Sequence, residues 1–195
     1  MIGRLTGTLL AKEPPLLWLD VNGVGYELEA PLSTFFTLPE TGASLTLHTH
    51  LTVREDAHIL FAFSTPAEKS LFRELIKVNG IGPKSALTVL SGVSVQEFWN
   101  TIRAADAARL TRLPGIGKKT AERLLIELKD KAGAAGAVSA GSSSAATHSV
   151  LQQAVSALVN LGYKPAEAER LARAAHEDGK SAEQVIRDAL KRAAR

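Results

Sequence analysis

The sequence predicts an α+β protein with several domains: a five-stranded β-barrel, an all-α region, and a three-helix bundle on a flexible linker. Three observations predict this arrangement. Apolar and polar residues alternate within residues 1–64, as in half-buried strands. A sixteen-residue pattern occurs twice within residues 65–131, and fifteen of the eighteen residues in 132–149 are Ala, Gly or Ser. We therefore expect a boundary at each change of pattern, with the last segment at residues 150–195.

The first segment has the signals of a small barrel. The dipeptide Asn22-Gly23 separates two apolar stretches, which is a strong signal for a two-residue hairpin turn. Five short strands in 64 residues favour a closed or partly open barrel of the OB type. The predicted strands cover residues 2–11, 16–21, 24–30, 45–53 and 59–63.

Helical signals begin at residue 65. Thr65, Pro66 and Glu68 form a capping box with proline at the first helical position, and Ser94 with Glu97 forms a second box. Apolar residues then recur at helical spacing. The second segment is therefore expected to be all-α.

The linker segment has too few large apolar residues to offset the entropy of ordering it. We expect residues 132–149 to be a flexible tether with a reach of about 20–25 Å. Beyond it, three short helical patterns are separated by the turn Leu161-Gly162-Tyr163 and by the cap Ser181. Three helices in 46 residues give a marginal core, which suits a small docking domain.

An internal repeat is the most informative feature of the chain. Residues 75–90 align with residues 110–125, with seven of sixteen positions identical, and each copy reads helix, Gly-Ile-Gly, helix. Glycines allow a tight turn and a close phosphate approach, and the free N–H groups that begin the next helix attract anions. This tandem helix-hairpin-helix pattern predicts nucleic-acid binding without base reading. The alternative is that each turn only joins two helices. The residues assigned to phosphate binding are Gly80, Ile81, Gly82, Lys84, Ser85, Gly115, Ile116, Gly117, Lys118, Lys119, Thr120 and Arg123.

Charge is distributed unevenly along the chain. The first segment carries net −4, the second +5, the linker none and the last segment +2. A basic region beside an acidic one suggests a polyanionic partner that is steered into place.

Several chemistries are excluded or disfavoured. Neither glycine turn has the third glycine of a dinucleotide loop or the Gly-Lys-Ser/Thr ending of a P-loop, so we expect no ATP hydrolysis by this chain. His48 and His50 share a strand face but lack an evident third ligand, and we interpret them as a solvated strand face. Cysteine is absent. We therefore expect no metal and no cofactor. The lack of cysteine also fits a reducing cytoplasm, and no apolar run or signal sequence suggests a membrane.

In order along the chain, these features resemble the RuvA family of bacterial Holliday-junction proteins. The resemblance covers essentially the whole sequence, and residues 53–57, Val-Arg-Glu-Asp-Ala, are its most specific part. It implies that four subunits form a disc in which Glu55 and Asp56 are an acidic pin near the axis. Repulsion between these pins and phosphates would hold a four-way junction open and square. Without the resemblance, two carboxylates in an exposed turn carry no special meaning.

The resemblance also implies partners and a cellular role. It implies a homotetramer, with an octamer of two facing discs left open, and the RuvC resolvase as a further partner. It implies a non-catalytic subunit that acts in homologous recombination, DNA repair and the SOS response to DNA damage. The last segment would dock the hexameric ATPase RuvB for branch migration. The docking residues would be Leu161, Gly162, Tyr163, Leu171, Ile186 and Leu190.

Two other functions compete with this interpretation. A glycosylase or nuclease could use the two hairpins to grip its substrate, but only one helix and the linker follow Gly117, which leaves no room for a base pocket. An RNA-binding protein of ribosomal type would not explain the acidic hairpin or the tethered end. Incubating junction DNA with the protein and Mg²⁺ would separate a binder from a nuclease.

Overall fold

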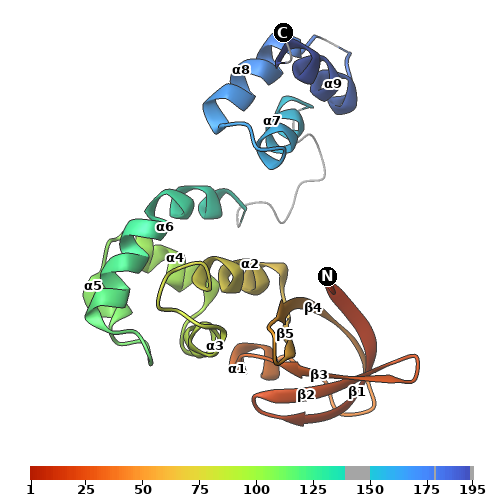
Figure 1. Cartoon of the computed structure of the whole chain (residues 1–195), viewed down its shortest axis with the longest axis vertical. Helices are drawn as coiled ribbons and strands as arrows, with labels where there is room; N and C mark the ends of the chain where they lie inside the picture. Colours follow the sequence, from red (N-terminus) through yellow and green to blue (C-terminus); the bar gives the residue numbers. More distant parts are fainter. Residues whose placement is uncertain (139–149, 178, 194–195) are drawn as a thin grey trace. The chain divides into compact units, whose positions relative to one another are not determined.

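The computed structural model describes residues 1–138, 150–177 and 179–193. The chain forms two compact units, Met1–Ala140 and Gly141–Arg195 (Figure 1). The first unit contains two hydrophobic clusters, one in the barrel and one in the helical region, and the second unit contains one. The predicted fold class is confirmed: the chain has a five-stranded barrel, a helical middle region and a helical C-terminal region. Within these described ranges, no helix is long and apolar enough to cross a membrane.

The barrel contains all five predicted strands, with bounds within two residues of those expected. It closes in the order β1-β2-β3-β5-β4. Neighbouring strands are antiparallel, except that β3 and β5 meet in parallel at the single pair Glu29 and Phe61. Asn22 and Gly23 both have positive φ, 52° and 85°, as the predicted hairpin turn requires. The strands are β1 (Arg4–Glu13), β2 (Leu16–Val21), β3 (Val24–Glu29), β4 (Ser44–Val53) and β5 (His58–Phe63).

One short helix, α1 (Leu32–Phe35), was not predicted. Its four residues are too few to show a helical period in the sequence. Its first N–H, on Leu32, donates to Ser91 Oγ at 2.9 Å. The loop between β3 and β4 is thereby bound to the helical region.

Both predicted capping boxes are present in the middle region. Thr65 with Glu68 caps its first helix, and Ser94 with Glu97 caps its third. Its last helix, α6, continues to Val138 and so includes the first seven residues of the segment predicted to be linker. Ala has the highest helix propensity, so this Ala-rich sequence can extend a helix that is already formed. The rest of the predicted linker, residues 139–149, lies outside the described residues. The helices are α2 (Pro66–Leu75), α3 (Pro83–Gly92), α4 (Val95–Arg103), α5 (Ala107–Leu110) and α6 (Lys118–Val138).

The barrel and the middle helices lie in one compact unit, and each has its own cluster of buried residues. Phe61 and Phe63 of β5 are buried in the helical core, with ring centroids 5.0 and 4.9 Å from that of Phe72 on α2. The buried carboxylate of Glu68 accepts hydrogen bonds from the hydroxyl groups of Ser33 and Ser64, each at 2.6 Å. A shared core and a buried polar network therefore join the strands to the helices.

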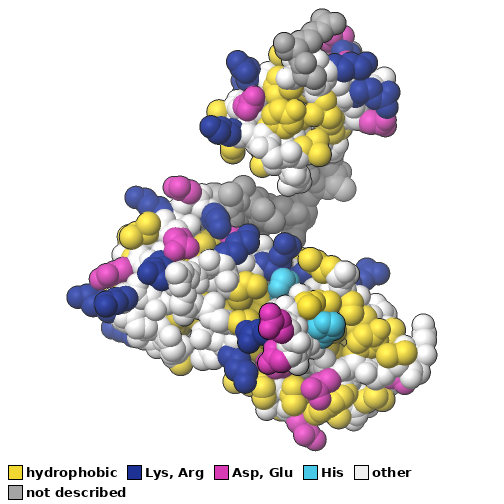
Figure 2. Space-filling model, in the orientation of Figure 1, with side chains coloured by type: hydrophobic (Ala, Val, Ile, Leu, Met, Phe, Trp, Pro, Cys, Tyr) yellow, Lys and Arg dark blue, Asp and Glu magenta, His cyan; other side chains and the backbone are white. Residues whose placement is uncertain are grey.

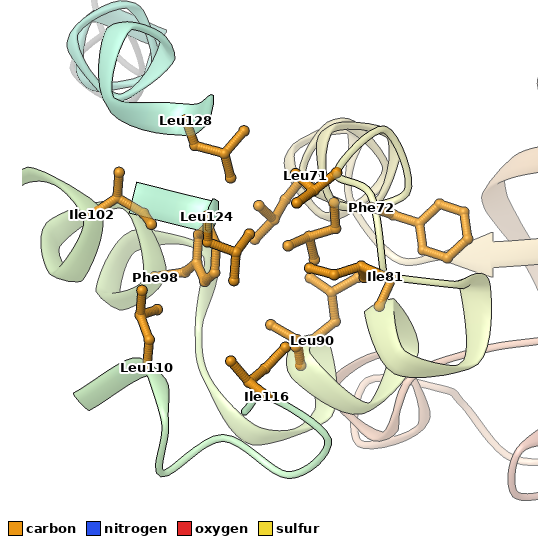
Figure 3. Packing of buried hydrophobic residues seen from close by; sticks show 14 of the residues in the cluster. Leu71, Phe72, Ile81, Leu90, Phe98, Ile102, Leu110, Ile116, Leu124 and Leu128 are labelled. Carbon is orange, nitrogen blue, oxygen red and sulfur yellow. The ribbon is translucent and has the colours of Figure 1, made fainter. Parts of the chain in front are cut away.

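The core of the middle region draws side chains from both copies of the repeat. Ile81 and Ile116, one from each Gly-Ile-Gly turn, are each 5% exposed. Figure 3 shows them directed into the same cluster, on either side of Leu90. Each isoleucine therefore anchors its turn to a common core, and its side chain is not available to a phosphate.

The second unit contains three helices, α7 (Val150–Asn160), α8 (Pro165–Ala175) and α9 (Ala182–Ala193). The predicted cap of the last helix is present, since the Gln184 N–H donates to Ser181 Oγ at 3.3 Å. The core of this unit consists mostly of alanines. Its buried residues are Ala154, Leu158, Ala168, Leu171, Ala172, Ala175, Val185 and Ala189.

Candidate nucleic-acid interface

The first Gly-Ile-Gly turn joins α2 to α3. Gly80 has φ +93°, a conformation that L side chains rarely adopt. The Ile81 N–H donates to Val78 O at 3.0 Å, and the Ala86 N–H donates to Gly82 O at 3.0 Å as the first bond of α3. The N–H groups that precede Ala86 in α3 have no partner within the helix. They are therefore free to bind an anion beside the turn.

The second turn joins α5 to α6 with the same geometry. Gly115 has φ +80°. The Ile116 N–H donates to Leu113 O at 3.1 Å, and the Ala121 N–H donates to Gly117 O at 2.9 Å. Each bond matches its counterpart 35 residues earlier to within 0.1 Å. The sequence repeat is therefore a structural repeat, although α5 has only four residues against ten in α2.

Both turns are accessible and carry lysines. Lys84, Lys118 and Lys119 are all exposed, and among the described residues none of the three makes an ion pair. Ser85 and Thr120 follow a lysine in their copy of the repeat. Two helix N-termini with free N–H groups and adjacent lysines can each bind a phosphate.

Arg123 differs from the lysines because it already has a partner. Its Nη1 donates to the main-chain oxygen of Asn79 at 2.7 Å. The sequence assigned this arginine only to phosphate binding and could not show that it reaches the other copy of the repeat.

The acidic pair lies at the tip of the hairpin between β4 and β5. The last strand pair joins Val53 to His58, and the Arg54 N–H donates to Ala57 O at 2.8 Å. Glu55 and Asp56 therefore lie in the bend, and both are exposed. In this position the carboxylates can meet a ligand in front of the hairpin.

A cleft of about 200 Å³ connects the base of this hairpin to the first turn. It places Arg54 beside the first turn, although the sequence did not single out this arginine as a site residue. The only available signal was its place next to the acidic pair. The cleft is lined by Glu29, Arg54, Ile59, Phe61, Gly82, Pro83, Lys84 and Ser85.

The interpretation of His48 and His50 as a solvated strand face is wrong for His50. Its ring packs edge-on against Phe72 of α2 at 5.5 Å, and its Nδ1 is buried without a hydrogen-bond partner. Burial, and then the nearby charges of Arg73 and Lys69, lower the pKa of His50 below its usual value. The face is covered because α2 packs on the barrel. In the described part of the chain, no group of three or more His, Cys, Asp or Glu residues could hold a metal ion.

The residues predicted for partner docking divide into two groups. Leu161 is 61% exposed, next to Gly162 with φ +100°. Leu171 is only 8% exposed and belongs to the core of the second unit, so it offers little surface to a partner. The remaining three, Tyr163, Ile186 and Leu190, are partly buried against that core.

The visible surface is consistent with the charge distribution along the sequence. Figure 2 shows many of the Lys and Arg side chains of the first unit over its helices, and several of the Asp and Glu side chains over its barrel. Acidic side chains occur in both parts of this unit, but the net charge is negative for the barrel and positive for the helices.

Comparison with known proteins covers nearly every part of the chain. Residues 1–62 match the RuvA N terminal domain, residues 72–130 match the SAM-like helix-hairpin-helix tandem, and residues 149–194 match the RuvA C-terminal domain.

Full-length relatives agree with these matches. A protein of Thioalkalivibrio sulfidiphilus is 54% identical over 197 residues, with 98% of each chain covered. A protein of Stutzerimonas stutzeri is 52% identical over 199 residues, again with 98% of each chain covered. A protein of Methylococcus capsulatus is 52% identical over 201 residues, with both chains covered completely. Each is named Holliday junction branch migration complex subunit RuvA. With the same order of barrel, tandem hairpins and C-terminal helices, the chain belongs to the RuvA family.

Proposed function

We propose that this protein binds four-way DNA junctions, holds them open and square, and loads a hexameric RuvB ATPase that drives branch migration. The observation that carries the proposal is the duplicated turn, in which one hydrogen-bond geometry occurs twice in a single compact unit. The names of the relatives, subunits of a Holliday junction branch migration complex, support the same function.

The turns bind DNA through its backbone. Main-chain N–H groups and the lysines Lys84, Lys118 and Lys119 contact phosphate oxygens, which are the same for every base sequence. Each lysine that pairs with a phosphate releases condensed counterions, so binding weakens steeply with salt. The protein therefore recognises the form of the junction and not its base sequence.

The acidic hairpin selects the open form of the junction. In a fourfold assembly, four copies of Glu55 and Asp56 would meet phosphates at the crossover. Like charges repel there, so the DNA strands are kept apart at the centre while the turns hold the arms. A homotetramer is the simplest assembly with this symmetry, and an octamer of two facing tetramers would cover both sides of the DNA.

The second unit docks the motor. It is compact in itself and lacks the Gly-Ile-Gly turns of the first unit. We assign the docking surface to the exposed Leu161 with Gly162 and Tyr163, and to the partly exposed Ile186 and Leu190. These residues present apolar surface of the kind that protein partners bind.

The chain itself performs no chemistry in this proposal. ATP hydrolysis belongs to RuvB, and the RuvC resolvase is a further partner that would cut the held junction. The protein thus acts in the bacterial cytoplasm, in homologous recombination, DNA repair and the SOS response to DNA damage, and it needs no cofactor.

The test uses labelled four-way junctions of two unrelated sequences and a duplex of equal length. We expect the full chain to retard both junctions equally and more strongly than the duplex, and to leave them intact in Mg²⁺. Cut DNA would indicate a nuclease, and equal binding of duplex would contradict junction recognition.

Removal of residues 150–195 tests the motor interface. We expect junction binding close to that of the full chain and no ATP-driven branch migration when RuvB is added. A point variant, Leu161→Asp in the full chain, tests the same surface without removing the unit. It should weaken branch migration without changing DNA binding. Full migration by the truncated protein, or its dissociation to monomers, would refute a docking role.

A further inference from the structure

One polar contact links the two copies of the repeat. Arg123, on α6 of the second copy, donates to the main-chain oxygen of Asn79, at the start of the first turn. The two residues are 44 positions apart in the sequence. This hydrogen bond joins the two copies of the repeat, which the sequence alone offers no reason to connect.

The contact has no counterpart in the opposite direction. In the repeat alignment, Arg123 corresponds to Thr88 and Asn79 corresponds to Pro114. The Thr88 hydroxyl donates to Lys84 O at 3.0 Å, within its own helix, and its side chain is much shorter than that of arginine. The second copy therefore donates a hydrogen bond to the turn of the first copy, and among the described residues Thr88 of the first copy makes no equivalent bond to the second.

The position of the bond determines what it does. The Asn79 carbonyl and the Gly80 N–H belong to one planar peptide unit, so a bond that holds the carbonyl also orients the N–H. The guanidinium lies against this turn, since a Cβ on Gly80 would be 3.9 Å from Arg123 Nη1. Gly80 has φ +93°, and a glycine can leave this conformation easily because it adopts positive and negative φ about equally well. The arginine limits this freedom at the point where a phosphate would bind.

We propose that Arg123 is a positioning residue that holds the Asn79–Gly80 peptide and thereby fixes the first turn relative to the second. The proposal rests on the assignment of both turns to DNA phosphates. An arginine carries five N–H donors in a rigid fork. It holds the turn with Nη1 while its other donors remain for a phosphate, a combination that the single ammonium group of lysine does not reproduce. The same side chain would therefore set the spacing of two bound phosphates along one DNA arm.

The first experiment measures the flexibility of the first turn in the absence of DNA. Hydrogen–deuterium exchange of the full-length protein is compared for Arg123→Lys, Arg123→Ala and the control Lys119→Ala. We expect faster exchange in peptides that cover residues 78–85 for both Arg123 variants, and unchanged exchange over residues 113–117 in all three. Unchanged exchange over residues 78–85 in both Arg123 variants would overturn the proposal, even if the protein binds junctions as proposed.

The second experiment measures junction affinity and its dependence on salt. Arg123→Lys keeps the positive charge, so the dependence of affinity on salt should stay as in the wild type while affinity falls by about fivefold at every salt concentration. Lys119→Ala should instead reduce the salt slope, because it removes a charge that pairs with a phosphate. Wild-type affinity for Arg123→Lys would show that only its charge matters and would reject the positioning role. Absence of junction binding by the wild type would reject the proposed function and leave the exchange result standing.

Discussion

The two glycines of each turn make separable contributions, and this provides the sharpest test of the interface. Gly115 has φ +80°, whereas Gly117 lies outside the left-handed region, and a Cβ on either residue would meet nothing within 4 Å. Alanine at Gly115 is therefore strained by the backbone alone. Alanine at Gly117 fits the folded protein but places a methyl group where a phosphate would approach the start of α6.

The expected effects have different signs. An L residue in the left-handed region is disfavoured by about 1–2 kcal/mol, which lowers the melting temperature of a unit of this size by about 2–8 °C. Gly117→Ala should leave the melting temperature unchanged or raise it slightly, because alanine reduces the entropy of the unfolded chain. Its junction affinity should nevertheless fall by about tenfold, since the methyl group prevents the close approach.

Thermal unfolding followed by circular dichroism and gel retardation of a labelled junction measure the two effects separately. Gly82→Ala in the first turn is the internal control, because it also lies outside the left-handed region with no atom within 4 Å of its Cβ. It should behave like Gly117→Ala. Wild-type DNA affinity for a stably folded Gly117→Ala variant would refute the assignment of these turns to phosphates.

Three further outcomes are expected. Neutralising the acidic pair with Glu55→Gln and Asp56→Asn should strengthen duplex binding and reduce selectivity for the junction by about tenfold, because the repulsion is removed; an unchanged selectivity ratio in competition assays would contradict the pin. Lys118→Ala should weaken binding to all junction sequences equally and lower the salt slope by about one, because one charge that pairs with a phosphate is removed; a sequence-dependent effect would argue against backbone recognition. The lowered pKa of His50 means that the unfolded chain binds the proton more tightly, so stability should fall as the pH drops below about 6.5. Chemical denaturation between pH 7.5 and 5 should show a smaller decrease in stability in His50→Phe, and equal decreases in both proteins would exclude this histidine as a cause.

The parts of the fold that the sequence predicted depend on neighbouring residues. The Asn22-Gly23 turn, the two capping boxes and the Gly-Ile-Gly turns each need a few adjacent residues with particular backbone or side-chain properties. The sequence assigned Ile81 and Ile116 to the phosphate-binding turns, but their side chains are buried in the core, so only the main chain of these residues faces a ligand.

The parts that were missed depend on residues far apart in the sequence. The burial of Phe61 and Phe63 in the helical core, and the cover that α2 provides over His50, follow from packing between a strand and a helix. Local patterns do not report which helix will lie on which strand. The same limit applies to Arg123, because a charged residue near a glycine turn gives no sign that it contacts a different turn.

The packing between strand β5 and helix α2 would let the proposed attraction and repulsion act on one DNA molecule. Strand β5 begins next to the acidic hairpin and includes Phe61 and Phe63, which pack on Phe72 of α2. Helix α2 then leads into the first turn, and Arg123 connects that turn to the second copy of the repeat. The carboxylates and both proposed phosphate sites are thus joined through packed side chains and hydrogen bonds within one unit. A DNA molecule bound to the turns as proposed would therefore meet the acidic tip at a separation set by the fold, and a DNA form that brings phosphates too close to that tip would be disfavoured.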